Sequence, residues 1–415
     1  MAAIHCSRVP MKIIVLSSLA YSLVNFRGDL LKAMIDNGHT VIACAPDRDL
    51  VTQNKLTDMG VEFVVTPMQR TGTNPVSDFV LALDYFRLIR REQPDIVLAY
   101  TQKPIIYGGL ATRLANLVGS HAKFFALMSG LGQVFTEGAG YASWLRIAVI
   151  RLYRAAIAKS QATFVFNADD RKDMIALGII SHHQKVIQVP GSGVSLARFP
   201  PCAPVVLPTR FLMIGRLMRN KGIVEFLEAS RLVRRNFPHC EFQIVGRCED
   251  ENPSGISRAE SERLAAEYEV DFVPGTDDVR PYLAACSVFV LPSYYREGLP
   301  RTILEALASA RAVITTDLPG CRDAVVDGIN GYLVRPRDEN DLAMAMMRFA
   351  AEPERANVMG KASLALAQDV YDVDKVNLQL LGEMGLINSS GVHPQERRPN
   401  TSKIPPHQIA ASSGA

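Results

Sequence analysis

The sequence predicts an α/β protein built from two doubly wound domains, and three observations lead to this fold class. The chain has 415 residues, which is longer than a chain that a single small hydrophobic core can organise. Short apolar runs alternate with segments of helical periodicity along most of it, as they do in βαβ units with parallel sheets. This alternation stops once, at residues 189–208, and then starts again.

The first half reads as one domain spanning residues 11–190. Its apolar runs predict strands and its periodic segments predict helices between them. The expected strands are 12–17, 40–45, 61–66, 95–100, 123–128, 163–167 and 185–189, and the expected helices are 27–37, 77–92, 104–117, 143–159 and 169–177.

The segment 189–208 is rich in residues that interrupt regular structure. It contains Pro190, Gly191, Gly193, Pro200, Pro201, Pro204 and Pro208. Such a run is expected to form no packed element and to act as an interdomain linker.

The second half repeats the alternation and predicts a second domain over residues 205–365. The expected strands are 210–214, 241–245, 270–273, 287–291, 312–315 and 331–334, and the expected helices are 222–236, 257–268, 279–285, 300–308, 321–326, 339–350 and a stretch from 353 to about Met384. Residues 386–415 are rich in Ser, Pro, Gly, Asn and Gln, so we expect a disordered tail that cannot offset its ordering entropy.

Composition and charge exclude several classes of protein. Apolar residues make up 48% and charged residues 21% of the chain, which is ordinary for a globular protein. The net charge of +3 gives no reason to expect a nucleic-acid partner. Neither the seven cysteines nor the eight histidines have the spacing of a metal site, and the cysteines read as buried thiols. No apolar run is long enough to span a membrane.

The most informative motif follows the apolar run 287–291 and reads Pro-Ser-Tyr-Tyr-Arg-Glu-Gly-Leu-Pro-Arg-Thr-Ile-Leu-Glu from Pro292. It joins a buried strand to a helix. Pro300 suits the first helical position, because its missing N–H would have had no partner there. The amides of Arg301 and Thr302 then point out of the helix start and can hold an anion.

Two acidic residues of this motif, Glu297 and Glu305, are separated by seven residues. Singly, Glu297 could complement the helix dipole, and Glu305 could lie on a solvated helix face. As a pair at a strand–loop–helix junction, they closely resemble the acidic pair of the family-four GT-B glycosyltransferases.

This resemblance implies roles for the residues of the motif. Glu297 would contact hydroxyls of the donor sugar, and Glu305 would bind the ribose of the nucleotide. The loop around Gly298, Leu299, Arg301 and Thr302 would contact the sugar and phosphates, although Pro300 stands where many family members have glycine and offers no amide.

A second motif, Gly215-Arg-Leu-Met-Arg-Asn-Lys221-Gly222, follows the first strand of the second domain and opens a helix. Gly215 allows close approach of the backbone to a ligand. Arg216 and Lys221 suit a diphosphate that becomes more negative as it departs. By resemblance these two cations replace a metal ion, and no Asp-x-Asp metal motif is evident at a strand end. We therefore expect no cofactor besides the nucleotide-sugar donor. At a third strand end, Val273 and Pro274 would offer backbone contacts to the base.

Acceptor recognition falls to the first domain in this family. The loop after the first strand reads Asn25-Phe-Arg27-Gly28, which resembles a bacterial branch acting on polyprenyl-diphosphate-linked sugars and on capsule or O-antigen repeats. Thr101 and Lys103 stand near the position where other members place a histidine. The motifs beginning at Ser129 and Asn167 also fit this branch, and we assign Asn25, Arg27, Thr101 and Lys103 to acceptor binding.

The helix 143–159 carries Arg146, Arg151, Arg154 and Lys159 among apolar residues. A basic amphipathic helix can lie on anionic lipid, yet a helix packed on the core with a solvated basic face fits the pattern equally well. Both interpretations stay open from the sequence.

Together these observations predict a GT-B protein, whose two Rossmann-like domains face across a cleft, with a helix at residues 366–385 that crosses back to the first domain. The resemblance implies a retaining hexosyltransferase that moves an N-acetylated hexosamine or hexose from a UDP-sugar to a lipid-linked or glycan acceptor. We expect it in the cytoplasm, peripheral on the inner face of the plasma membrane. A GT-B sugar-nucleotide epimerase and a non-catalytic nucleotide-sugar-binding protein are the alternatives.

Overall fold

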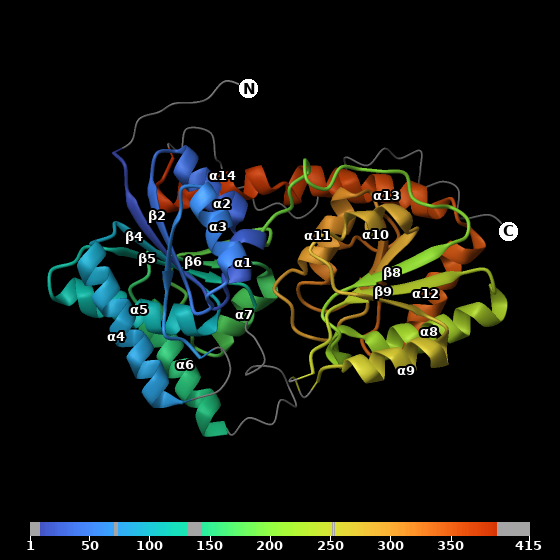
Figure 1. The fold of residues 1–415 in the computed structure, drawn as a ribbon, viewed down its shortest axis with the longest axis horizontal. Helices are drawn as coiled ribbons and strands as arrows, with labels where there is room; N and C mark the ends of the chain where they lie inside the picture. Colours follow the sequence, from blue (N-terminus) through green and yellow to red (C-terminus); the bar gives the residue numbers. More distant parts are fainter. Residues whose placement is uncertain (1–8, 70–73, 131–142, 251, 253, 388–415) are drawn as a thin grey trace.

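The computed structural model describes residues 9–69, 74–130, 143–250, 252 and 254–387. It has two lobes side by side, each built on one parallel sheet, with the last helices running along one side of both (Figure 1). The prediction of two doubly wound α/β domains is confirmed.

The first lobe holds a sheet with strand order β3-β2-β1-β4-β5-β6-β7, in which all neighbours are parallel. Its elements, in chain order, are β1 (Lys12–Leu16), α1 (Ala20–Asn25), α2 (Gly28–Asp36), β2 (Thr40–Ala45), α3 (Leu50–Asp58), β3 (Glu62–Val65), α4 (Pro75–Glu92), β4 (Ile96–Tyr100), α5 (Gln102–Leu117), β5 (Lys123–Met128), α6 (Ser143–Ile157), β6 (Ala162–Val165), α7 (Ala168–Ala176) and β7 (Val186–Gln188).

The second lobe holds a sheet with strand order β10-β9-β8-β11-β12-β13, again parallel throughout. Its elements are β8 (Arg210–Ile214), the 3₁₀ turn η2 (Arg219–Lys221), α8 (Ile223–Asn236), β9 (Glu241–Gly246), α9 (Arg258–Tyr268), β10 (Asp271–Pro274), α10 (Arg280–Ala285), β11 (Val288–Leu291), α11 (Arg301–Ala308), β12 (Ala312–Thr316), η3 (Arg322–Ala324), β13 (Gly331–Val334), α12 (Glu339–Ala351), α13 (Arg355–Leu366), the π-helical turn η4 (Ala367–Tyr371) and α14 (Val373–Met384).

Every strand expected from the sequence is present, with ends within two residues of the expectation. Two short helices were missed, α1 and α3. Helix α3 begins after Asp49, whose side chain accepts a hydrogen bond from the amide of Val51 at 3.1 Å. That capping residue was a usable signal, but only Thr52 and Leu56 of the helix are buried, so its apolar periodicity is weak.

Both faces of the first sheet are buried, as expected for parallel strands covered by helices on each side. In β1, Ile13 and Val15 belong to one apolar cluster, whereas Ile14 and Leu16 belong to another on the opposite face. The first of these clusters continues through the segment between the lobes into the second sheet.

The segment between the lobes is packed, contrary to the expectation of a linker without packed structure. Val189, Val194 and Phe199 are buried. The Val194 amide donates to the Tyr371 carbonyl at 2.8 Å, and the Val373 amide donates to the Val194 carbonyl at 3.0 Å. The chain therefore crosses between the lobes twice, and the two crossings are hydrogen-bonded to each other.

Helix α14 lies on the first lobe beside α2 (Figure 1). The Lys185 ammonium and the Glu383 carboxylate form an ion pair at 2.7 Å, and Gln379 donates to the Gln188 carbonyl at 3.0 Å. Leu386, which the sequence analysis assigned to the disordered tail, is buried, and its carbonyl lies 3.0 Å from Nε2 of His39. The tail prediction is wrong for Leu386, because its apolar side chain is buried where the chain packs on the first lobe. Residues 388–415 lie outside the described residues.

Candidate functional site

Most of the predicted site residues lie near the points where the strand order reverses in each sheet. In the second sheet the reversal falls between β8 and β11, and in the first between β1 and β4. Ligands of open parallel sheets bind outside the carboxyl ends of the strands at such a point. The loop from Gly215 and the loop from Pro292 leave β8 and β11 there, so tertiary structure brings the two motifs of the second lobe together.

Backbone contacts hold these two loops against each other. The Asn220 carbonyl accepts from the amides of Tyr294 at 3.0 Å and Tyr295 at 3.1 Å. Gly222 has a φ of +82°, and a Cβ there would lie 2.1 Å from the Pro292 carbonyl oxygen. Glycine is required at this position, both for its left-handed conformation and for the close approach.

Lys221 and Glu297 form an ion pair across the two loops, with 13% of each side chain exposed. The Ser293 hydroxyl donates to the same carboxylate at 3.1 Å, and the Lys221 ammonium lies 5.7 Å from the centre of the Tyr295 ring. A buried cation and carboxylate at a switch point can bind the phosphates and hydroxyls of a substrate, because both charges are already desolvated.

Glu305 pairs with Arg301 one turn earlier on α11, with Arg301 Nε donating to Glu305 Oε1 at 3.1 Å. Burial raises the pKa of the Glu305 carboxyl, and Arg301 opposes that shift. The alternative of a solvated helix face is therefore wrong for Glu305.

Pro300 is the N-cap of α11 and not its first helical residue, because its ψ of 119° is extended. The shift of one position leaves the amides of Arg301 and Thr302 in the first turn, where no carbonyl of the helix can accept from them. Gly298 and Leu299 precede them in the loop, and Leu299 packs on Gly191 of the segment between the lobes.

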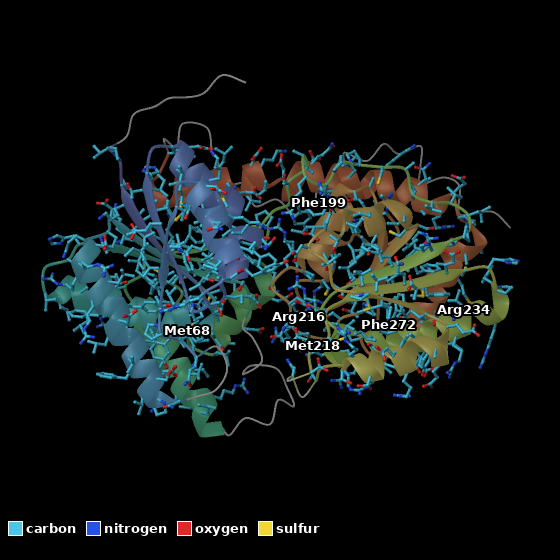
Figure 2. The ribbon with its side chains drawn as sticks, in the orientation of Figure 1. Met68, Phe199, Arg216, Met218, Arg234 and Phe272 are labelled. Carbon is cyan, nitrogen blue, oxygen red and sulfur yellow. The ribbon has the colours of Figure 1, made fainter. Side chains whose placement is uncertain are left out.

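Arg216 lies on the side of the second lobe that faces the first (Figure 2). Its side chain is 50% exposed, and the 3.7 Å from its Nη1 to Oε1 of Glu249 is too long for a hydrogen bond. A Cβ on Gly215 would meet nothing within 4 Å, so the backbone there borders open space. Both features fit a loop that a ligand approaches.

Val273 and Pro274 end β10, the edge strand two positions from β8. Strand β9 lies between β10 and β8. The residue after β9, Arg247, forms an ion pair with Asp277 at 2.5 Å. The Arg247 guanidinium also lies 5.6 Å from the centre of the Tyr21 ring in the first lobe. The two lobes therefore meet along this edge of the second sheet as well.

Arg27, in the loop after β1, is buried and has no carboxylate partner among the described residues. Its guanidinium lies 5.2 Å from the Tyr100 ring centre and 5.5 Å from that of Phe166, and its Nε has no hydrogen-bond partner. Burial lowers the pKa of Arg27 to about 10, which still leaves it charged at neutral pH, and nearby Arg301 adds to the shift.

The other acceptor-binding candidates differ in whether their polar side-chain groups already have partners within the protein. Lys103 donates to Asp78 at 2.7 Å and to the Gln69 carbonyl at 2.9 Å, so its charge is neutralised within the lobe. Asn25 donates to the Tyr21 carbonyl at 3.0 Å. Thr101 has a φ of +69°, and its buried hydroxyl has no hydrogen-bond partner among the residues that the structure describes. Such strain at the end of a central strand is frequent at functional sites.

Sequence reasoning missed a set of contacts between α7 of the first lobe and the loops of the second. Asn167 donates to the Gly298 carbonyl at 2.8 Å. Arg322 and Asp169 form an ion pair at 2.9 Å, and Arg296 and Asp173 form another. No local pattern reveals these contacts, because the partners lie more than 120 residues apart in the chain.

The part of the chain that the structure describes contains no metal site and no disulfide bond. It holds no group of His, Cys, Asp and Glu that could bind a metal ion. Its six cysteines are free thiols. No helix within those ranges is both long and apolar enough to cross a membrane.

Two family models match the chain. One, described as glycosyl transferases group 1, matches residues 208–352, and the other, a glycosyl transferase 4-like domain, matches residues 25–190. The matched ranges contain all the predicted site residues and every strand of the two sheets except β1.

Two curated relatives align with most of the chain. An N,N'-diacetylbacillosaminyl-diphospho-undecaprenol alpha-1,3-N-acetylgalactosaminyltransferase of Campylobacter jejuni is 27% identical over 387 residues, covering 88% of this chain and 95% of the relative. A UDP-Gal:alpha-D-GlcNAc-diphosphoundecaprenol alpha-1,3-galactosyltransferase of Escherichia coli is 25% identical over 321 residues, covering 73% and 78%.

Solved structures share the fold. A sucrose-phosphate synthase from Thermosynechococcus elongatus superposes with a TM-score of 0.73 at 19% identity, covering 90% of this chain and 98% of that one. Anabaena HepE in complex with UDP and glucose gives a TM-score of 0.72 at 16% identity, covering 91% and 100%. At these identities the likeness supports the two-domain fold alone.

The buried carboxyl of Asp170 gives the stability of the fold a pH dependence. Burial raises its pKa to about 7, although the Asn167 amide and Arg296 oppose the shift. An unfolded aspartate titrates near 3.9, so the folded protein binds an extra proton between about pH 4 and pH 7. The stability that Asp170 contributes is therefore full at low pH and is lost as pH rises through that range.

We expect Asp170→Asn to remove this loss of folding stability at higher pH, because an amide cannot ionise. Melting temperatures measured at pH 5 and pH 8 should show the variant gaining on the wild type as pH rises. Asp58→Asn, at an exposed position, should show the same difference from wild type at both pH values. An Asp170→Asn difference that does not change with pH would contradict the assignment.

Proposed function

We propose that this chain, which belongs to the GT-B glycosyltransferases, transfers a sugar with retention of configuration from a UDP-sugar to a polyprenyl-diphosphate-linked acceptor. The transfer would serve assembly of a bacterial surface polysaccharide or glycan. The observation that carries the proposal is the buried Lys221–Glu297 pair at the switch point of the second sheet, beside the exposed Arg216 and the first turn of α11.

In the proposed reaction, the bond between the anomeric carbon and the β-phosphate oxygen breaks. The acceptor hydroxyl oxygen bonds to that carbon on the same face, and its proton passes to an oxygen of the departing diphosphate. Negative charge grows on the diphosphate, where Arg216, Lys221 and the amides of Arg301 and Thr302 stabilise it. We assign no side chain as a nucleophile.

Glu297 would bind hydroxyls of the donor sugar while remaining paired with Lys221. The ion pair with Lys221 and the hydrogen bond from the Ser293 hydroxyl hold the carboxylate in place. Glu305, held by Arg301, would accept hydrogen bonds from the ribose. The backbone at Val273 and Pro274 would contact the base.

The acceptor assignment rests on Arg27 and on the two relatives. A buried cation without a carboxylate is costly unless an anion reaches it, and a diphosphate on the acceptor supplies one. The names of both relatives specify diphospho-undecaprenol acceptors. Thr101 and Asn25 would position the acceptor sugar, whereas Lys103 would act through its ion pair with Asp78.

An acceptor embedded in lipid requires a surface that reaches the membrane, and we propose helix α6 for this contact. Arg146, Arg151 and Arg154 are exposed on it, as are half of Ile147 and about a third of Leu152. Basic side chains beside exposed apolar ones suit anionic lipid headgroups. The protein would then lie at the cytoplasmic face of the plasma membrane.

Loss of the Lys221 ammonium should impair transfer more than binding. We expect Lys221→Ala to remove a charge-assisted contact of about 1.5–3 kcal/mol, which lowers turnover by roughly one to two powers of ten. The assay follows radiolabel from a panel of UDP- and GDP-sugars into the lipid phase of a bacterial membrane extract. Lys32→Ala, at an exposed site, is the matched control.

Wild-type turnover in Lys221→Ala would refute the assignment to the diphosphate. If the wild-type protein moves no label from any donor but converts a UDP-sugar to its epimer, the epimerase alternative replaces the proposal. Binding of a donor without any conversion would leave a nucleotide-sugar-binding protein.

Transfer should not need a divalent metal, because Arg216 and Lys221 supply the positive charge that a metal would otherwise bring to the diphosphate. We expect the rate in excess EDTA to stay within about twofold of the untreated rate. A strict requirement for added Mg²⁺ or Mn²⁺ would count against the cationic loop as the diphosphate site.

Reversing two charges on α6 should weaken membrane binding. Each basic residue near an anionic surface is worth about 1 kcal/mol, so we expect Arg146→Glu with Arg151→Glu to reduce flotation with phosphatidylglycerol vesicles at least about tenfold. The control, Arg258→Glu with Arg263→Glu, changes two exposed arginines on α9 of the second lobe. Equal flotation of both double variants would overturn the α6 contact.

A further inference from the structure

We infer that Asn167 is a positioning residue for transfer: from the first lobe, its amide holds the loop Glu297–Gly298–Leu299 of the second lobe in the conformation that binds the donor sugar. The inference rests on the proposed function for the role of that loop. It adds that the donor site is completed only when both lobes are in contact.

Asn167 is fully buried and uses both ends of its amide. Its Oδ1 accepts from the Asp170 amide at 2.7 Å, which caps helix α7. Its Nδ2 donates to Asp170 Oδ2 at 3.0 Å and to the Gly298 carbonyl at 2.8 Å. Both hydrogens of the amide nitrogen are therefore used, one inside the first lobe and one across to the second. An aspartate at this position could not donate either bond.

The Gly298 carbonyl has little freedom to turn away from Asn167. A Cβ on Gly298 would lie 2.4 Å from the carbonyl oxygen of Ser129 and 3.0 Å from the amide of Gly130 in the first lobe. On the other side, a Cβ on Gly320 would lie 2.4 Å from the Glu297 carbonyl oxygen. The loop is thus enclosed by backbone from both lobes, and the Asn167 bond fixes which way its peptide faces.

Ion pairs reinforce the same contact. Arg296, next to Glu297, pairs with Asp173 of α7, and Arg322 pairs with Asp169 at the start of that helix. About a third of each side chain is exposed, so each pair stabilises little by itself. They set the register of α7 against the loop, and Asn167 then makes the one fully buried hydrogen bond of the group.

A purely local role for Asn167 would be to cap α7, and the chain offers a comparison for that role. Asn74 caps α4, and its side chain accepts from the amides of Val76 and Ser77 of its own helix. Within the described ranges, the Asn74 side chain makes no hydrogen bond to the second lobe. Serine caps helices almost as well as asparagine. Asn167→Ser therefore keeps a cap and loses the amide nitrogen that donates to Gly298 and to Asp170, whereas Asn74→Ser changes a cap alone.

The first measurement is hydrogen exchange by mass spectrometry, on the full chain without any donor. Loss of one buried hydrogen bond of about 1 kcal/mol corresponds to several-fold faster opening. We expect exchange in peptides covering residues 293–299 to rise about fivefold in Asn167→Ser and to stay unchanged in Asn74→Ser. Equal exchange of this segment in both variants and the wild type would overturn the inference.

The second measurement separates positioning from general destabilisation. In Asn167→Ser we expect the donor KM to rise about tenfold and the calorimetric Kd for UDP alone to stay within about twofold, because the sugar contacts depend on the loop. Both serine variants should unfold in a single cooperative transition, which shows that each is folded. Unchanged donor KM, or parallel loss of UDP affinity, would overturn the inference. If wild-type protein fails to bind UDP, the proposed function fails instead, and the exchange result still tests the loop contact.

Arg296→Gln provides a second variant should Asn167→Ser not fold. It removes the ion pair with Asp173 and leaves the α7 cap intact. Faster exchange over residues 293–299 supports the contact, and wild-type exchange argues against it.

Discussion

The ion pair between Lys221 and Glu297 joins the two loops that leave the second sheet where its strand order reverses. At that point the crossovers from β8 and β11 run in opposite directions along the sheet. A ligand therefore meets two loop ends with no helix between them. Because Asn220 and Gly222 pack the two loops backbone to backbone, the charges on them are held close together.

Backbone also packs directly against backbone between the two lobes. Glycines at positions 130 and 298 let two backbones touch where any side chain would intervene, and α7 supplies the polar groups around that contact. A loop held from both sides is well suited to bind a sugar whose orientation decides the reaction, since correct placement accounts for much of the rate in group transfer. A glycosyltransferase that opens to admit substrates would assemble its donor-sugar contacts on closing.

On the opposite side of the molecule, hydrogen bonds and apolar packing join the two lobes. Val194 is hydrogen-bonded to the residues that precede α14, so the two crossings between the lobes form one connection. Helix α14 and Leu386 complete the apolar cluster that runs from the first sheet into the second. On the side where Asn167, Arg296 and Arg322 make their contacts, polar groups join the lobes.

The sequence by itself determined the order and type of nearly every element, because the alternation of apolar strands and amphipathic helices is a local pattern. It also determined the chemistry available at each strand end, including the Glu297 and Glu305 pair and the cations of the Gly215 loop. Tertiary structure decided which of these groups meet. Asn167 and Gly298 are 131 residues apart, and Lys103 forms an ion pair with Asp78. Arg27 has no carboxylate partner in the part of the chain that the structure describes. Bonds of this kind depend on how two lobes and several helices are placed in space, and no pattern confined to neighbouring residues carries that information.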